Sequence, residues 1–196
     1  MTPPRGSSCS IIAVAGRRVD AADTQTTRFP YGNADAVQAA LARTLENAAA
    51  LLVVASAACG SDLLALDAAS VLGIRTRIIL PFAPDVFRET SVVDRPYPAY
   101  WGSLYDRLIA EARERGDLIV LDRDRNDPGA YVAANQAIIA EALLAASKEA
   151  PPARPIAVIA WEGAPRGDDD ATDDFRRAAL QRGFSVKQIS TLAPSE

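Results

Sequence analysis

The 196-residue chain contains no histidine, and this absence restricts the chemistry open to it. Without histidine it cannot form a Ser-His-Asp or Cys-His nucleophile, a histidine general base or a histidine-ligated zinc site. Its two cysteines, Cys9 and Cys59, are too few for a disulfide framework or a cysteine metal site. Any enzyme built from this chain must therefore rely on carboxylates, arginine, hydroxyl groups, backbone dipoles or an added metal ion.

A strong excess of charge is also missing, because 21 basic and 25 acidic residues leave a formal net charge of −4. With no long basic run, the chain is not expected to bind nucleic acid. No uncharged apolar run reaches membrane length, since Asp62 and Asp67 interrupt the longest candidate. Residues 1–10 are polar and lack the apolar segment of a signal peptide. We therefore expect a cytoplasmic protein with no membrane partner.

Apolar strands alternate with amphipathic helices along the chain. Strands are predicted at residues 11–15, 51–55, 75–80, 117–121, 156–161 and 184–189. Helices are predicted at 33–50, 61–72, 100–114, 131–147 and 170–181, with a short helix at 85–88 inside the loop 82–99. This alternation is typical of a parallel sheet with helices on both faces. We expect one domain over residues 1–196, a Rossmann-like three-layer αβα sandwich (fold class α/β) whose mainly parallel sheet has about six strands, with an irregular tail over about residues 1–10.

The turn between the predicted strand 51–55 and helix 61–72 is the strongest candidate site. It consists of small and polar residues: Ser56, Ala57, Cys59, Gly60, Ser61 and Asp62. A strand that turns into a helix at the carboxyl edge of a parallel sheet offers unpaired N–H groups to an anion. We expect a phosphate or ribose oxygen at the N–H groups near Gly60 and Ser61, a hydrogen bond from Ser56, and a preference of Asp62 for ribose hydroxyls. The alternative is a tight turn in which Ser61 or Asp62 caps the helix.

Arginines follow the first predicted strand, which ends at Gly16. Arg17, Arg18 and Arg28 fall on the same edge of the predicted sheet, and guanidinium groups match phosphate oxygens bidentately. Asp20 would lie near the ribose. The alternative is a solvated loop in which these arginines pair with nearby aspartates.

The third predicted strand stops at Pro81, and Phe82 follows it. Phe82 is a candidate for stacking on a nucleobase, with packing in the core as the alternative reading. The loop that continues from there, residues 82–92, is expected to fold over the site as a cover, because loops of this length in compact domains are often functional.

Carboxylates gather near the end of the fifth predicted strand, at Glu162 and in the run 168–170. Glu162 is the candidate catalytic residue, because cleavage of an N-glycosidic bond needs one positioned carboxylate and a water molecule. Aspartates beside a phosphate also suit Mg²⁺, so a magnesium ion bound with the nucleotide is the one cofactor considered. The alternative is structural, since aspartates in a first helical turn are stabilised by the helix dipole.

Motif-like segments occur in order along almost the whole chain. Residues 16–20 read Gly-Arg-Arg-Val-Asp and precede Arg28-Phe29-Pro30, while residues 56–65 read Ser-Ala-Ala-Cys-Gly-Ser-Asp-Leu-Leu-Ala. Leu80-Pro81-Phe82, Phe87 and Ser91-Val92 follow, and then Trp161-Glu162-Gly163 with Asp170-Ala171-Thr172-Asp173. These segments resemble the "G-H-R-x-D … R-F-P", "G-x-A-x-G-A-D-x-L-A", "L-P-F … F … S-V" and "W-D-G … G-G-T-A-D" motifs of one branch of the SLOG superfamily. That superfamily is the Rossmann-like group that includes the DprA/Smf and lonely-guy proteins.

The resemblance implies a Rossmannoid domain that binds a nucleotide or nucleotide-derived ligand, often as a sensor or an accessory domain. From the last motif it adds Gly163 and Thr172 to the candidate binding residues. The chain departs from the pattern at Arg17, which replaces a histidine, and at the pair Asp169-Asp170, which stands where Gly-Gly is usual. The lonely-guy pattern P-G-G-x-G-T-x-x-E is absent, so the phosphoribohydrolase activity of those enzymes is not carried over.

We therefore expect a protein that binds or senses a nucleotide-type small molecule, such as an ADP-ribose-like ligand, without chemistry. One alternative is a hydrolase that cleaves an N-glycosidic or phosphate bond of such a ligand. The other is a non-catalytic interaction module that assembles through its helices. These readings allow two kinds of macromolecular partner: further copies of the chain in a homo-oligomer, or an effector protein.

Overall fold

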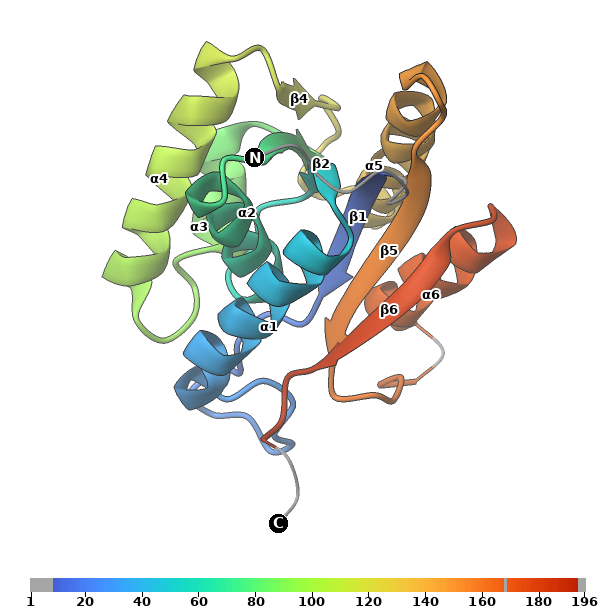
Figure 1. Ribbon diagram of the computed structural model, residues 1–196. Coiled ribbons are helices and arrows are strands. Elements are labelled where there is room, and N and C mark those ends of the chain that lie inside the picture. Colours follow the sequence, from blue (N-terminus) through green and yellow to red (C-terminus); the bar gives the residue numbers. More distant parts are fainter. Residues whose placement is uncertain (1–8, 168, 194–196) are drawn as a thin grey trace.

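The computed structural model describes residues 9–167 and 169–193. Its centre is one sheet of six parallel strands in the order β4-β3-β2-β1-β5-β6 (Figure 1). The strands are β1 (Ser10–Gly16), β2 (Ala50–Ala55), β3 (Arg75–Leu80), β4 (Leu118–Val120), β5 (Arg154–Trp161) and β6 (Ser185–Ser190). All six predicted strands are therefore present. Most of the expected tail, residues 1–8, lies outside the described residues, and Ser10 already belongs to β1.

Helices cover both faces of the sheet, which confirms the three-layer αβα sandwich. The helices are α1 (Ala34–Asn47), α2 (Ser61–Val71), α3 (Pro84–Ser91), α4 (Pro98–Glu114), α5 (Ala130–Lys148) and α6 (Ala171–Gln181). Figure 1 shows α1, α2 and α4 in front of the sheet and α5 and α6 behind it. The helix α3 is longer than the short turn expected at 85–88, because Pro84 suits the first helical position and Phe87 is buried.

The strand β1 shows how the sequence builds the two faces. Ile12 and Val14 pack among the residues of α1, α2 and α4, whereas Ile11 and Ala13 pack among those of α5 and α6. Successive side chains of a strand point to opposite faces, so a continuous apolar run suits a strand that is buried on both sides. Such burial fixes the position of Gly16 at the end of β1.

The helix α5 is long and apolar enough to cross a membrane when judged by length and composition alone. In the structure Ile138, Ile139 and Ala142 of this helix are buried in the core beneath the sheet. The helix packs on β1, β2, β3 and β5, while Tyr131, Val132 and Leu144 on it are exposed.

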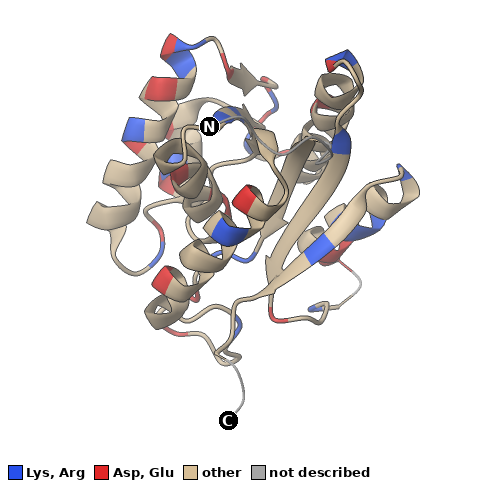
Figure 2. Cartoon of the chain, in the orientation of Figure 1, with Lys and Arg blue, Asp and Glu red and all other residues tan. Residues whose placement is uncertain are grey.

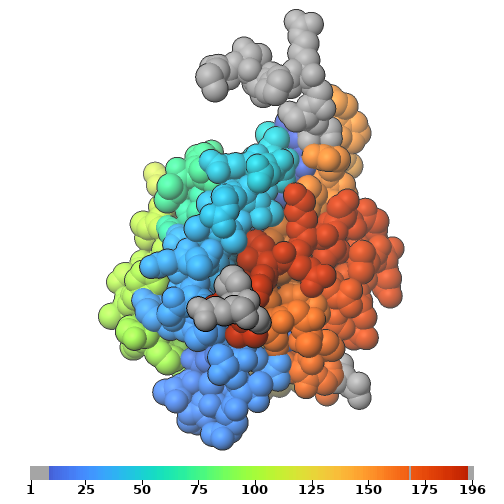
Figure 3. All heavy atoms as spheres, turned by 60° about the horizontal axis from the view of Figure 1, so that its bottom comes forward, coloured from blue at the N-terminus to red at the C-terminus, as the bar shows by residue number. Residues whose placement is uncertain are grey.

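The carboxyl ends of β1, β5 and β6 point toward the lower edge of the molecule in Figure 1. After β1 the chain passes to α1 on one face, and after β5 it passes to α6 on the other. The point between β1 and β5 is thus a topological switch point, the usual ligand crevice of an open α/β sheet. Figure 2 shows charges of both signs on the loops of this edge, and Figure 3 shows the loop after β1 beside the loop after β5.

Candidate functional site

The guanidinium of Arg17 occupies the switch point between β1 and β5. Its Nη1 and Nη2 donate to the two oxygens of Asp170 at 2.7 Å each, and its Nε donates to Glu162 Oε2 at 2.5 Å. Nη2 also donates to the carbonyl of Ala164 at 2.9 Å. Arg17 is only 4% exposed. The side chain expected to bind phosphate therefore joins two loops of the protein itself.

The two carboxylates around Arg17 are held in their ionised form. Burial opposes ionisation, but hydrogen bonds from Arg17 and from neighbouring donors, together with the charge of Arg17, outweigh it and lower the pKa of both Asp170 and Glu162 below their ordinary values. Asp170 also caps α6, because Oδ1 accepts the Thr172 N–H at 2.9 Å. Glu162 accepts a further hydrogen bond from Arg28. A carboxylate with a lowered pKa and both oxygens engaged is poorly suited to act as a general base, so this geometry disfavours Glu162 as the catalytic residue.

Carboxylates of the region 168–170 do not form a metal centre in the described part of the chain. Asp170 serves Arg17 and the start of α6, Asp169 is exposed, and Asp168 lies outside the described residues. Across residues 9–167 and 169–193, no group of three or more Asp, Glu or Cys side chains is placed to hold a metal ion.

The start of α2 is covered by the protein's own backbone. The N–H and the hydroxyl of Ser61 both donate to the carbonyl of Arg17, at 3.1 and 2.8 Å. Gly60 has a φ of +97°, and a Cβ there would lie 2.7 Å from the same carbonyl. The close approach thus requires glycine, and it does not leave the Ser61 N–H open to a phosphate.

Several other predicted binding residues are buried in the core or lie in an exposed turn. Ala57 and Cys59 are fully buried, and burial raises the pKa of the Cys59 thiol above its ordinary value. Phe82 is also buried, with its ring centroid 5.8 Å from that of Phe87, so it packs in the core beside Pro81. Gly163 lies exposed in the turn after β5. The core reading of Phe82 therefore fits the structure better than base stacking.

A cavity of about 460 Å³ opens at the carboxyl edge beside β1 and β2. It brings together these predicted residues: Gly16, Arg17, Arg18, Asp20, Arg28, Ser56, Asp62 and Thr172. Phe87 and Ser91 also line it, from the helix α3 and not from the loop that was expected to cover the site. Sequence reasoning missed Arg95, Tyr131, Asn135 and Arg166, which also line it. Asn135 carried a usable signal, since it is a polar residue within the largely apolar helix α5.

The cavity wall is rich in guanidinium groups that share carboxylates. Arg18 and Arg95 both pair with Asp94, the second at 3.8 Å. Arg28 shares Glu162 with Arg17, and Arg166 lies 3.7 Å from Asp170, which Arg17 also holds. The Nε groups of Arg18 and Arg95 are buried and have no hydrogen-bond partner among the described residues. The wall is therefore lined by guanidinium groups, a type of donor that suits an anion, and these already pair with carboxylates of the protein.

Aspartates at the cavity differ in what they do. Asp20 accepts the backbone N–H groups of Arg28 at 3.0 Å and Phe29 at 3.1 Å, so it shapes the loop after β1. Asp62 accepts the N–H of Ala58 at 3.3 Å and has no other hydrogen bond within residues 9–167 and 169–193. Burial raises the pKa of Asp62 to about 7, and the charge of Arg18 opposes this rise. Asp62 is thus a carboxyl group able to change its protonation state near neutral pH at the cavity.

The chain was also compared with known proteins. No protein-family model matches it, and no curated protein matches it. Among solved structures it is similar to DNA processing protein A (DprA) from Streptococcus pneumoniae, with 19% sequence identity and a TM-score of 0.43. The alignment covers 92% of this chain and 59% of DprA, so the chain spans little more than half of that protein.

Replacing Asp170 by Asn tests the buried ion pair. The variant leaves Arg17 with one charged partner in place of two, so we expect Asp170→Asn to lower the free energy of unfolding by about 3 kcal/mol. Asp106→Asn is the matched control, because Arg88 also binds Asp106 with two hydrogen bonds but at an exposed site, where the expected loss is below about 1 kcal/mol. Urea unfolding measures both, and equal losses would contradict the structural role given to Arg17.

Acid should reduce the difference in stability between wild type and Asp170→Asn. The pKa of Asp170 is lowered in the folded protein, so its contribution to stability is present above the unfolded pKa of about 4 and is lost as the pH falls further. Urea unfolding at pH 7 and at about pH 3 measures this change.

The pKa of Asp62 gives a pH dependence of the opposite sign. Its folded pKa of about 7 lies above its unfolded value, so folding retains a proton that the unfolded chain releases between about pH 4 and 7. Stability from this group is therefore lost as the pH rises through that window. We therefore expect Asp62→Asn and wild type to have similar free energies of unfolding at about pH 4. At about pH 8 the variant should be more stable than wild type by about 2–4 kcal/mol.

Urea unfolding at these pH values measures the gap between Asp62→Asn and wild type. Asp23→Asn, a change at an exposed aspartate of the loop after β1, is the control and should follow wild type. A gap for Asp62→Asn that stays constant with pH would show that Asp62 ionises freely in the folded protein.

Proposed function

We propose that the protein binds a nucleotide-type anion in the cavity at the carboxyl edge of the sheet, with its phosphate beside Arg18 and Arg28. The observation that supports this most is the composition of the wall. Arg18, Arg28, Arg95 and Arg166 line the cavity and share carboxylates with one another or with Arg17. Guanidinium donors without full partners favour phosphate, whose oxygens accept several hydrogen bonds at once.

Position and size support the same proposal. The cavity lies at the carboxyl ends of parallel strands, where open α/β sheets bind ligands. Its volume of about 460 Å³ falls within the range of about 300–1,000 Å³ for small-molecule sites. An ADP-ribose-like ligand is the finer form of the proposal, since it would offer both phosphate and ribose groups to the wall.

The alternatives drawn from the sequence receive less support. A hydrolase that uses Glu162 as its base would need a free carboxylate, whereas both Glu162 oxygens accept hydrogen bonds from arginines. A pure interaction module would have its own side chains filling the edge of the sheet. Arg17 does fill the switch point, yet the neighbouring cavity stays open. We therefore favour ligand binding without chemistry.

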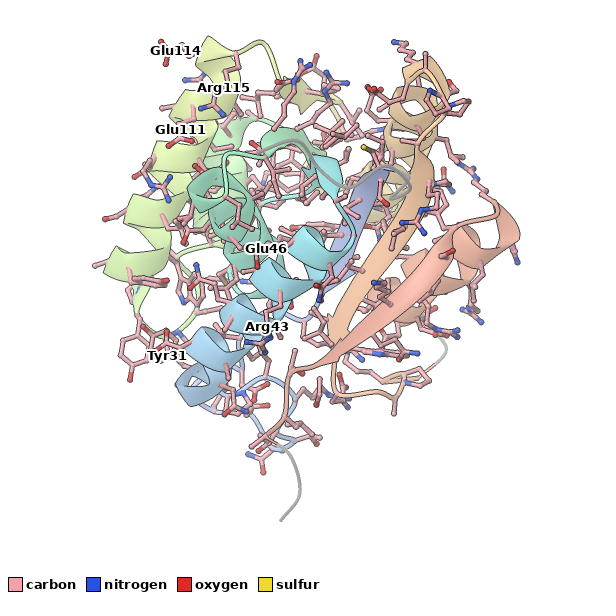
Figure 4. The ribbon with its side chains drawn as sticks, in the orientation of Figure 1. Tyr31, Arg43, Glu46, Glu111, Glu114 and Arg115 are labelled. Carbon is pink, nitrogen blue, oxygen red and sulfur yellow. The ribbon has the colours of Figure 1, made fainter. Side chains whose placement is uncertain are left out.

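Titration calorimetry with AMP, ADP and ADP-ribose, each with and without Mg²⁺, tests the proposal. Loss of charged hydrogen bonds in Arg18→Ala is expected to raise the Kd about tenfold or more. Arg115→Ala is the control, because Arg115 lies at the far end of α4 beside a second hollow at the opposite edge (Figure 4). It should bind like wild type.

Two results would contradict the proposal. The first is the absence of binding heat and of any thermal shift with millimolar concentrations of every nucleotide in the panel. The second is an affinity that falls in Arg115→Ala and not in Arg18→Ala, which would place the anion at the opposite edge of the sheet.

A further inference from the structure

We infer that Asp62 and the polar groups around it form a subsite for the sugar hydroxyls of the ligand, so that the cavity selects nucleotides with an intact ribose diol. This inference rests on the proposed function and adds to it a direction: the phosphate lies on the arginine wall and the ribose lies beside Asp62. The feature that supports it is a small chamber that shares its polar residues with the main cavity.

This small chamber has a volume of about 70 Å³. Apolar residues of β1 and α5, among them Val14 and Ile138, form part of its wall. Its polar side chains are Ser56, Asp62, Asn135 and Thr172, and all of them also line the main cavity. Since a water molecule takes up about 30 Å³ of liquid, the chamber has room for about two hydroxyl-sized groups.

The polar groups of the chamber have few partners in the protein. Among residues 9–167 and 169–193, no hydrogen bond engages the side-chain oxygens of Ser56, Thr172 or Asn135. Asn135 is nevertheless held in place, because its Nδ2 donates to the carbonyl of Ala171 at 3.2 Å. Polar groups inside a protein are normally hydrogen-bonded, so these oxygens are available to a ligand or to water.

The chemistry of the chamber suits hydroxyls better than phosphate. An ionised Asp62 repels a phosphate, whereas a hydroxyl group can donate to the carboxylate or accept from the neutral acid. Arg18 is the group whose positive charge acts on Asp62. Oxygens that accept, together with hydroxyls that donate and accept, match the two neighbouring hydroxyls of a ribose.

The test compares AMP with 2′-deoxy-AMP in titration calorimetry of the whole protein. Wild type is expected to bind AMP about five- to tenfold more tightly, which corresponds to one lost hydrogen bond of the kind that stabilises proteins. Asp62→Ala should bind the two nucleotides within about twofold of each other, while Asp62→Asn, whose amide also bonds a hydroxyl, should retain part of the preference.

Arg18→Ala is the matched variant for the phosphate end of the ligand. It should weaken AMP and 2′-deoxy-AMP by the same factor and leave the preference for AMP unchanged. Circular dichroism and the Tm of each variant check that it folds. The comparison therefore separates a hydroxyl contact at Asp62 from a general loss of affinity.

Each outcome bears on the inference. If wild type binds both nucleotides equally, or if Asp62→Ala keeps the preference, the sugar subsite is wrong while the proposed function stands. If wild type binds neither nucleotide, the proposed function fails and the subsite fails with it. A preference that disappears in Asp62→Ala and persists in Arg18→Ala supports the subsite.

Discussion

The buried guanidinium of Arg17 is the interaction on which the carboxyl edge of this protein depends. It ties the loop after β1 to the loop after β5 through Glu162 and Asp170. Its backbone carbonyl accepts the N–H and the hydroxyl of Ser61 at the start of α2. One residue thus closes the usual crevice of the fold and also covers the helix end that most often binds phosphate in such sheets.

Because Arg17 fills the switch point, the open cavity lies to one side of it. The cavity lies beside β1 and β2, with α3, α5 and the start of α6 around it. Its charged donors are arginine side chains, which share Asp94, Glu162 and Asp170 among them, rather than a helix terminus. The proposed anion site thus lies at the edge of the sheet and consists of side chains.

Sequence patterns predicted the fold better than they predicted the partners within the site. Apolar runs such as that of β1 fix strands buried on both faces, and Ser56 and Asp62 follow from the strand-to-helix turn. The ion pairs of Arg17 did not follow from the sequence. Residue type alone cannot tell whether an arginine binds a phosphate or carboxylates that lie 145 and 153 residues away in the chain. The helix α3 was underestimated because its flanking prolines are also typical of loops. Oligomeric state, effector partners and cellular location stay predictions.

A crystal structure of the protein grown with millimolar AMP tests the central claim most directly, because it locates the ligand without assuming a site. The account predicts the phosphate beside Arg18 and Arg28 and the ribose facing Ser56 and Asp62, with the Arg17 ion pairs intact. A nucleotide held at the opposite edge, near Arg75 and Arg115, or one that displaces Asp170 from Arg17, would contradict it.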